Sequence, residues 1–473
     1  SMFYGIDKSR FKENKRFVPE KYMGPLIKTQ MTRCIHCTRC IRFATEVAGV
    51  SEIGAIGRGE DTQITTYLEK SMESELSGNV IDLCPVGALT SKPYVFEARP
   101  WELKKTESID VMDAVGSNIR IDTYGWEVKR ILPKINENIN EEWISDKTRY
   151  VCDGLKYQRL DTPYIKSNSN FKKISWHEAY STLTDKIKDT KSDKIGCITG
   201  DLTNMETLFS VKDFFNRILN CKNLDSRSEK TYVNNSSRSN YIFNTQISNI
   251  EKSDFILLIG ANPRHEATIL NSRIRKSYLK NNTEIYSLND IGDLTYPYKV
   301  ISNNTDELNK IILNEHEVSK KIISAKKPII IFGQSALKLN SSGYLFEGMK
   351  KFLSENNKIN DDWNAINVLS NNASTVGAYD LDIMDNETID KVLSNQFELI
   401  FLFGQDNLNI KKKNEFIVYI GTHGDRGAEM ADLILPSAAY TEQDGYYTNL
   451  EGNLQLAFKA SYPPGEAKED WEI

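Results

Sequence analysis

No apolar run in this chain approaches the roughly 20 residues needed to cross a bilayer, so we predict no membrane-spanning helix. The chain also has no large excess of either positive or negative charge. The 60 Lys and Arg stand against 65 Asp and Glu, and this balance gives no nucleic-acid signature. None of the glycine-rich turns forms a full G-x-G-x-x-G or P-loop, so phosphate binding is only weakly indicated. With no secretory signal and an odd count of seven cysteines, a reducing compartment is favoured over a disulfide scaffold.

Four of the seven cysteines form a pattern. Cys34, Cys37 and Cys40 are spaced three residues apart, and 43 residues lie between Cys40 and Cys84, which Pro85 follows. Thiolates at positions i, i+3 and i+6 of a short loop can converge on one soft metal centre, and a Cys-Pro pair often completes a [4Fe–4S] ligand set. The spacing therefore predicts one [4Fe–4S] cluster on these four cysteines and a role in electron transfer.

Zinc is the main alternative metal for four cysteines. Zinc sites with four thiolates usually consist of two separated C-x2-C pairs, so a zinc-stapled interaction module is the less favoured alternative. The other cysteines, Cys152, Cys197 and Cys221, are isolated, and we predict that they are ordinary buried or half-buried residues. His36 lies inside the motif, but its neighbours already supply the thiolates, so we do not expect it to bind the metal.

The region around the motif is basic. Residues 1–42 contain ten Lys and Arg against three acids. Three arginines lie within or beside the motif: Arg33, Arg39 and Arg42. A [4Fe–4S] core with four thiolates has a net charge of about −2 by formal counting, so nearby cations and dipoles stabilise it. A predicted helix over 41–48, ended by Gly49, would direct its N-terminal N–H groups towards the cluster.

Changes in composition divide the chain into four segments. They are a basic extended lead, a cluster domain, a β-rich segment and an α/β domain, over residues 1–33, 34–98, 99–158 and 159–473. In the β-rich segment, residues 118–132 predict a hairpin that turns at Tyr124–Gly125.

The last segment alternates strand and helix patterns. A helix is predicted to begin at a capping box between Ser175 and Glu178. Short apolar runs that end in glycine predict strands buried on both faces of a parallel sheet. These runs are Lys194–Gly200, Phe255–Gly260, Pro328–Gly333 and Leu399–Gly404.

Long, ordered blocks carry a family resemblance over nearly all of the chain. They are Met31–Phe43, Glu75–Pro93, Arg99–Asp110, Glu141–Arg149, Gly260–Glu266, Ala431–Pro436 and Asn449–Gly452. In these blocks the chain resembles the large iron–sulfur subunit (the 75 kDa class) of respiratory complex I, the proton-pumping NADH:ubiquinone oxidoreductase. The resemblance places the family's [4Fe–4S] ligands on Cys34, Cys37, Cys40 and Cys84.

The resemblance implies both fold and function. The expected fold is a small ferredoxin-like [4Fe–4S] domain, a β-rich segment and a molybdopterin-oxidoreductase-like α/β domain. The expected function is electron transfer inside an H+-translocating NADH:ubiquinone reductase, with no catalytic site in this chain. The implied partners are the NADH/flavin-binding subunit, the [2Fe–2S] subunit and the quinone-module subunits. The implied location is the matrix-side peripheral arm at the mitochondrial inner membrane. Abundant Asn, Lys and Ile suggest A+T-rich coding, which is common in organellar genomes.

The later blocks also resemble molybdopterin-dependent oxidoreductases such as formate dehydrogenases, which gives the main rival function. Those enzymes bind a [4Fe–4S] cluster with ligands spaced close to C-x2-C-x3-C-x27-C. On this chain that template falls on Asp110, Asp113, Ser117 and Ser145. Carboxylates and hydroxyls do not replace four thiolates around iron. Because no Cys or His is clearly placed to bind molybdenum, we expect the fold without molybdopterin.

The chain departs from the family at both ends. The family normally begins with a plant-type [2Fe–2S] domain and a [4Fe–4S] site of one His and three Cys. Residues 1–33 contain neither residue type. We therefore expect either a separate chain that carries those clusters or a partial sequence. The end at Trp471–Ile473 also falls inside a recognisable block, so a C-terminal truncation is expected.

Overall fold

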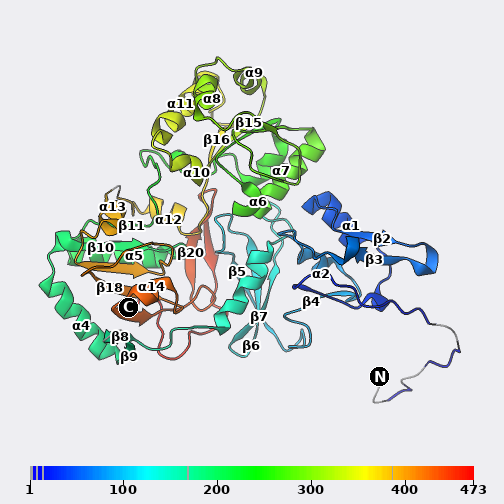
Figure 1. Ribbon diagram of the computed structural model, residues 1–473, viewed down its shortest axis with the longest axis horizontal. Coiled ribbons are helices and arrows are strands. Elements are labelled where there is room, and N and C mark those ends of the chain that lie inside the picture. The colour runs from blue at the N-terminus through cyan, green and yellow to red at the C-terminus, as the bar shows by residue number, and fades with distance from the viewer. Residues whose placement is uncertain (1–3, 7–8, 13–14, 168–169, 386) are drawn as a thin grey trace. The chain divides into compact units, whose positions relative to one another are not determined.

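The computed structural model of the chain describes residues 4–6, 9–12, 15–167, 170–385 and 387–473. The chain forms two compact units, Ser1–Glu97 and Ala98–Ile473, coloured blue and cyan to red in Figure 1. Among the described residues, no helix is both long and apolar enough to cross a membrane.

The first unit is built from short elements. Strand β1 (Ile27–Thr29) pairs with β4 (Leu89–Ser91), and β2 (Ile53–Ile56) pairs with β3 (Gln63–Thr66), both antiparallel. Its helices are α1 (Arg39–Arg42), the π-helix η2 (Phe43–Ala48) and α2 (Asn79–Leu83). Its 3₁₀ turns are η1 (Met31–Arg33), η3 (Gly59–Asp61) and η4 (Tyr67–Glu69).

The helix predicted over 41–48 is confirmed, and it starts earlier than expected. Helix α1 runs directly into η2, and Gly49 ends η2 in the left-handed conformation, with φ of 77°. Since α1 starts at Arg39, the third cysteine of the motif lies in the first turn of the helix. The π geometry was not predicted, because side-chain periodicity does not separate one widened turn from an α-helix.

The second unit begins with a three-stranded antiparallel sheet of β5 (Lys104–Ile109), β6 (Asn118–Tyr124) and β7 (Glu127–Pro133). The predicted hairpin is confirmed as β6 and β7, but its turn lies one residue later. Tyr124 pairs with Glu127, so Gly125 and Trp126 form the turn, and Gly125 has φ of 59°. Positive φ at the first turn residue explains why glycine occupies it. Helix α3 (Asp146–Tyr150) and η5 (Val151–Lys156) follow β7.

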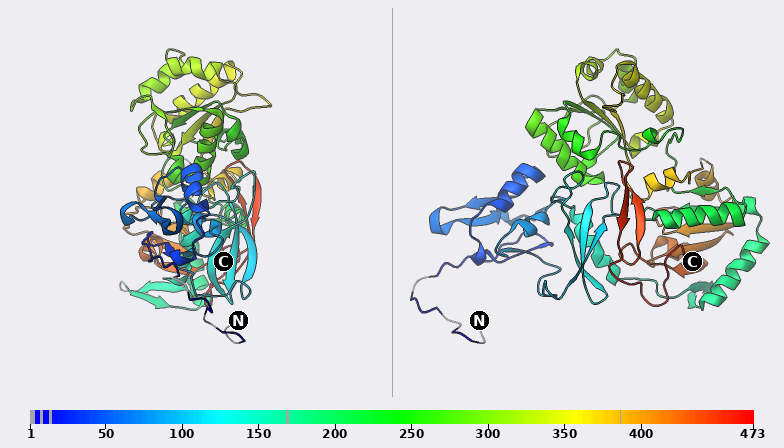
Figure 2. Two further views of the ribbon diagram at one scale, coloured as in Figure 1. Left: turned by 90° about the vertical axis from the view of Figure 1, so that its right-hand side faces the viewer. Right: turned by 180° about the vertical axis from the view of Figure 1, so that it is seen from behind.

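A seven-stranded sheet forms the largest layer of the second unit. Its strand order is β11 (Leu224–Asp225), β10 (Ile195–Thr199), β17 (Leu399–Phe403), β18 (Phe416–Gly421), β19 (Leu433–Pro436), β8 (Tyr164–Ser167) and β9 (Asn170–Lys173). The strands from β11 to β19 are parallel, and β8 and β9 add antiparallel. Side chains of β10 and β17 alternate between two hydrophobic clusters, so both faces are covered. The view from behind in Figure 2 shows α4 (Trp176–Asp189) and α5 (Met205–Asp213) along one face.

A five-stranded sheet, parallel throughout, forms the second layer, in the order β14 (Lys299–Val300), β13 (Glu284–Ser287), β12 (Phe255–Ile259), β15 (Pro328–Gly333) and β16 (Ile366–Leu369). Helices α8 (Thr305–Ile312), α9 (Glu317–Ser324) and α11 (Ser342–Glu355) pack on one face in a single hydrophobic cluster. Figure 1 shows α7 (Thr268–Asn281) across the sheet from them. The opposite placement follows from right-handed crossovers, because the α7 connection runs across the sheet from β12 to β13, whereas the α8–α9 and α11 connections run in the other direction, to β15 and β16.

The remaining elements connect these layers. A hairpin of β20 (Gly445–Thr448) and β21 (Leu454–Ala457) lies near α5. The shorter helices are α6 (Pro263–Glu266), α10 (Gln334–Leu337), α12 (Thr375–Asp380), α13 (Thr388–Leu393) and α14 (Arg426–Met430). The remaining 3₁₀ and π turns are η6 (Ser192–Lys194), η7 (Phe214–Ile218), η8 (Arg238–Asn240) and η9 (Ile247–Lys252). The capping box of α4 between Ser175 and Glu178 is confirmed.

All four predicted strands of the α/β segment are confirmed, but they are divided between two sheets. Strands β10 and β17 belong to the seven-stranded sheet, and β12 and β15 to the five-stranded one. Apolar runs reveal burial on both faces and carry no information about which strands pair. Cys152, Cys197 and Cys221 are buried, as predicted.

Candidate metal centre

The four motif cysteines line one cavity of the first unit. Cys34 directly follows η1, Cys40 lies in the first turn of α1, and Cys84 is the residue that ends α2. Between them the loop turns twice through the left-handed region, at His36 with φ of 54° and at Thr38 with φ of 59°. These two turns curl the seven-residue segment, so that all three of its thiols reach the same cavity as Cys84.

Apolar side chains separate most of the thiols from solvent. Ile64 from β3, Val86 from the loop after Cys84, and Leu89 from β4 line the cavity together with the cysteines. Cys34, Cys40 and Cys84 are half-buried, whereas Cys37 is exposed. A bound group would therefore be shielded on most sides and approachable on the side of Cys37.

Burial and repulsion between like charges oppose the ionisation of all four thiols. The pKa of Cys40 is raised from 9.0 to about 11, chiefly by burial and also by the negative charges of Cys34, Cys37 and Cys84. The Ile41 N–H, which donates to Cys40, acts in the opposite direction. A thiolate must be present to bind metal, so this site becomes fully ionised only when a cation compensates the four charges.

Four thiols that share one cavity suit a [4Fe–4S] cluster, in which each thiolate binds a different iron atom. Zinc would need all four sulfur atoms at about 2.3 Å from one centre. Among the described residues, no group of three or more His, Cys, Asp or Glu side chains that could hold a metal ion is found.

Two of the arginines within or beside the motif, Arg42 and Arg33, have different surroundings. Arg42 and Glu46 form an exposed ion pair at 3.1 Å, so the Arg42 charge is met by a carboxylate. Arg33 reaches the second ligand segment, where its guanidinium lies close to Gly87, in the loop after Cys84. Arg16, which the motif did not single out, contacts His36 inside the cysteine loop at 2.9 Å. No signal in the sequence pairs residue 16 with residue 36, because the contact depends on how the N-terminal segment folds back.

The four positions of the second cluster template come together in the other unit, and all four residues are buried. Thr148 donates to the Asp110 carboxylate at 2.7 Å, and its hydroxyl lies 2.8 Å from that of Ser145. The Asp110 N–H donates to the Ser117 carbonyl at 2.9 Å. Negative charge on Asp113 acts on Asp110, which places the two carboxyls near each other. The site therefore holds two buried carboxyls, of which Asp110 accepts from Thr148 and Asp113 accepts from the Val115 N–H.

Burial raises the pKa of both carboxyls. The pKa of Asp110 rises from 3.8 to about 7, first through burial and then through the charge of Asp113. The pKa of Asp113 rises to about 6, mainly through burial. Lys147, which donates to the Met112 carbonyl at 2.6 Å, lowers both values.

These raised values predict a pH-dependent stability. The folded state holds the Asp110 proton more tightly than the unfolded state, so its contribution is largest at low pH and is lost as pH rises from about 4 to about 7. At about 1.4 kcal/mol per pKa unit, the loss amounts to a few kcal/mol. Asp110→Asn should weaken the fall of Tm between pH 5 and 8, measured by calorimetry. Asp361→Asn, at an exposed position, is the control. Equal pH slopes in Asp110→Asn and the native chain would refute the assignment.

The α/β part contains a cavity of about 350 Å³ at the carboxyl ends of β17, β18 and β19. Three acidic side chains, Asp406, Asp425 and Asp470, line it, and its described lining includes no Lys or Arg. The buried Tyr440 hydroxyl and Gln443 carbonyl oxygen also line it and have no hydrogen-bond partner among the described residues. The carboxyl edge of a parallel sheet is the usual ligand position, but this lining offers no cation to a phosphate.

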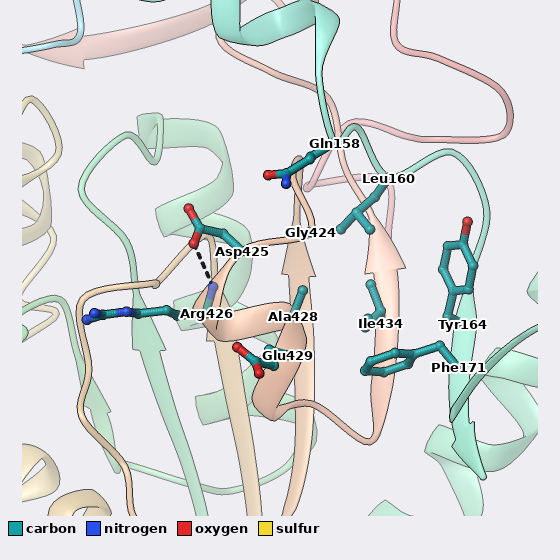
Figure 3. Close-up of a pocket in the computed structure, with 10 residues that line it drawn as sticks. All are labelled: Gln158, Leu160, Tyr164, Phe171, Gly424, Asp425, Arg426, Ala428, Glu429 and Ile434. Carbon is teal, nitrogen blue, oxygen red and sulfur yellow. Dashed lines mark hydrogen bonds between the residues drawn. The ribbon is translucent and has the colours of Figure 1, made fainter. Parts of the chain in front are cut away.

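A shallower groove of about 450 Å³ lies between α14 and the β8–β19 edge (Figure 3). Its wall is apolar at Leu160, Phe171 and Ile434, and the Arg426 side chain points away from these residues. The Asp425 carboxylate accepts from the Arg426 N–H at 2.8 Å, as a helix cap does. The described lining of the groove includes the carboxylates of Asp425 and Glu429 and no cysteine or histidine.

Family comparisons cover most of the chain. Residues 24–90 match a ferredoxin-like domain described as that of NADH-quinone oxidoreductase subunit 3. Residues 103–153 match an NADH-ubiquinone oxidoreductase NDSU1/NuoG-like 4Fe-4S domain. Residues 159–473 match the molybdopterin oxidoreductase family.

Relatives that match over nearly the whole of this chain agree with these family matches. The NADH-ubiquinone oxidoreductase 75 kDa subunit of Reclinomonas americana is 47% identical, over 100% of this chain and 71% of that protein. A subunit of the NADH-quinone oxidoreductase of Rickettsia bellii is 48% identical, over 99% and 68%. The mitochondrial 78 kDa subunit of Neurospora crassa is 47% identical, over 100% and 64%. Among solved structures, a chain of the Methylorubrum extorquens formyltransferase/hydrolase complex aligns over 66% of this chain with 11% identity and a TM-score of 0.47, too low to support an inference.

Proposed function

We propose an electron-transfer function, because this chain belongs to the family of large (75 kDa class) iron–sulfur subunits of NADH:ubiquinone oxidoreductase, respiratory complex I. The observation that carries the proposal is the shared cavity of Cys34, Cys37, Cys40 and Cys84. In this proposal the chain is a subunit of the reductase and contains no substrate site of its own.

The four cysteines are the proposed ligands of a single [4Fe–4S] cluster. When bound, the cluster supplies a one-electron carrier between NADH and ubiquinone, with a potential that such clusters can have anywhere from about −700 to +450 mV. The chain's own residues hold and shield it. Ile64, Val86 and Leu89 exclude water, and the helical turn of α1 directs the Ile41 N–H to Cys40. Low solvent access and N–H donors to sulfur are the means by which a protein sets cluster potential.

The second cluster position is proposed to be empty of iron. Residues 103–153 match a 4Fe-4S domain, yet the template positions are two carboxyls and two hydroxyls, and Thr148 joins Asp110 and Ser145 by hydrogen bonds. Oxygen donors of this kind do not bind a [4Fe–4S] cluster. Molybdopterin is likewise not proposed, since the cavity at the sheet edge is acidic. The α/β domain then serves as structural mass and docking surface.

The proposed partners are the NADH/flavin-binding, [2Fe–2S] and quinone-module subunits of complex I. The relatives include mitochondrial and bacterial proteins. We place this chain in the matrix-side arm of the mitochondrial enzyme, in contact with the membrane through the complex alone. The proposed domains remain 1–33, 34–98, 99–158 and 159–473.

Metal analysis and electron paramagnetic resonance (EPR) test the proposal. The full chain, loaded anaerobically with iron and sulfide and reduced with dithionite, should give the low-temperature EPR signal of one [4Fe–4S]⁺ cluster and contain about four iron atoms, as that cluster type requires. Stoichiometric zinc in an EPR-silent sample of the purified native protein would refute electron transfer and favour the zinc module. Molybdenum or tungsten in that protein would instead support the molybdopterin enzyme.

A further inference from the structure

The N-terminal segment of the first unit reaches the cysteine loop through one arginine. Arg16 is half-buried, whereas its neighbours Lys15 and Phe17 are exposed. One terminal guanidinium nitrogen of Arg16 lies 2.9 Å from Nε2 of His36 and 2.6 Å from the carbonyl oxygen of Thr62. Buried Val18 fixes the segment next to it, because its N–H and carbonyl both bond to the Thr32 hydroxyl, at 3.3 and 3.2 Å.

The two acceptors of Arg16 lie in two segments whose neighbouring residues line the cysteine cavity. His36 lies between Cys34 and Cys37, in the part of the loop that has left-handed geometry. Thr62 directly precedes β3, which contributes Ile64 to the cavity wall. Arg16 therefore fastens a ligand loop to a shielding strand that is separated from it by more than twenty residues of sequence.

The chemistry of the contact fixes the charge. A guanidinium only donates hydrogen bonds and stays protonated at any pH at which proteins fold. Nε2 of His36 must therefore accept the hydrogen bond in this contact. The cation in this contact is Arg16 itself. It acts from a fixed position next to the loop that supplies three of the four thiolates.

We propose that Arg16 is a positioning residue of the cysteine site, which holds the His36 loop in place and, as a permanent cation, favours the reduced state of the bound cluster. This inference rests on the proposed function. Reduction adds one electron to a group that is already negative, so a nearby positive charge stabilises the reduced form more than the oxidised form. Removing that charge lowers the midpoint potential.

Three variants of the full chain test the assignment. Arg16→Gln removes the charge and keeps a side chain that can donate a hydrogen bond, and Arg16→Lys keeps the charge. Arg10→Gln removes the same charge from an exposed arginine of the same segment, so it controls for net charge. Each is loaded anaerobically with iron and sulfide. Its iron content is measured, and its midpoint potential is determined by EPR-monitored titration with dithionite.

We expect normal iron content in all three variants and a lower midpoint potential in Arg16→Gln alone. Poised at the native midpoint potential, Arg16→Gln should show a ratio of reduced to oxidised cluster several-fold below that of the native chain. A native potential in loaded Arg16→Gln, or an equal shift in Arg16→Lys or Arg10→Gln, would overturn the electrostatic role. Loss of iron from both Arg16→Gln and Arg16→Lys would also overturn it, because the lysine variant keeps the charge and fails through lost geometry. An EPR-silent native chain would instead overturn the proposed function itself.

Discussion

Replacing Cys84 with serine is expected to abolish or convert the [4Fe–4S] signal of the loaded chain and to slow electron transfer through the assembled complex. Cys84 is the single proposed ligand that comes from the second segment, at the end of α2, whereas the other three proposed ligands share one loop. A serine hydroxyl is a hard donor that binds iron poorly compared with thiolate. The remaining three thiols would coordinate only three irons directly, so the fourth iron is held weakly and readily lost. EPR after dithionite reduction and an iron assay measure the loss, with iron falling from about four to three or fewer per chain.

Cys152→Ser is the matched control for this prediction. Cys152 is buried in the other unit and donates weakly to the Arg149 carbonyl at 3.5 Å. Its substitution removes a thiol from the chain without touching the proposed ligands, so the EPR signal and iron content should be unchanged. An intact cluster in Cys84→Ser, or a lost one in Cys152→Ser, would show that the ligand set is wrong.

The largest stability effect is expected from Arg159→Met. Arg159 and Glu442 form a bidentate ion pair at 2.7 and 2.5 Å, and their side chains are only 9% and 5% exposed. Arg159 also donates to the carbonyls of Thr422 and Leu155. Methionine leaves the Glu442 carboxylate buried without its cation. Breaking one partner of such a pair costs about 3–5 kcal/mol. Urea unfolding of the full chain should show a correspondingly lower midpoint.

The comparison for Arg159 is an exposed ion pair of the same unit. Lys173 and Asp161 lie 3.1 Å apart with side chains 62% and 40% exposed. Water screens and replaces this contact, so Lys173→Met should change the free energy of unfolding by no more than about 1 kcal/mol. Similar losses in Lys173→Met and Arg159→Met would contradict the view that burial sets the difference.

Local sequence pattern predicted well those strands and helix ends that a few consecutive residues determine. The apolar runs of β10, β12, β15 and β17 and the capping box at Ser175 are found in place, because burial on both faces and helix capping are encoded within a few residues. Pairing was not predictable. The assignment of those strands to two sheets depends on long crossovers, which leave no local mark in the sequence.

The cysteine site was predictable for a different reason. Spacing of three residues and the Cys84–Pro85 pair restrict the ligand chemistry before any fold is known. The structure adds what spacing cannot supply: the left-handed turns at His36 and Thr38, and the cation from Arg16. These depend on long-range contacts, such as the one that joins residue 16 to Thr62.

The hydrogen bonds among the buried template residues also bear on evolution. Asp110 accepts from Thr148, Thr148 is bonded to Ser145, and the Asp110 and Ser117 backbones are bonded to each other. Changing Asp110 or Ser145 to cysteine removes one partner from this network and still provides only one of four thiolates. Either step would lose stability before any affinity for iron was gained. The hydrogen-bonded network therefore disfavours a stepwise change from this arrangement to a set of four cysteines.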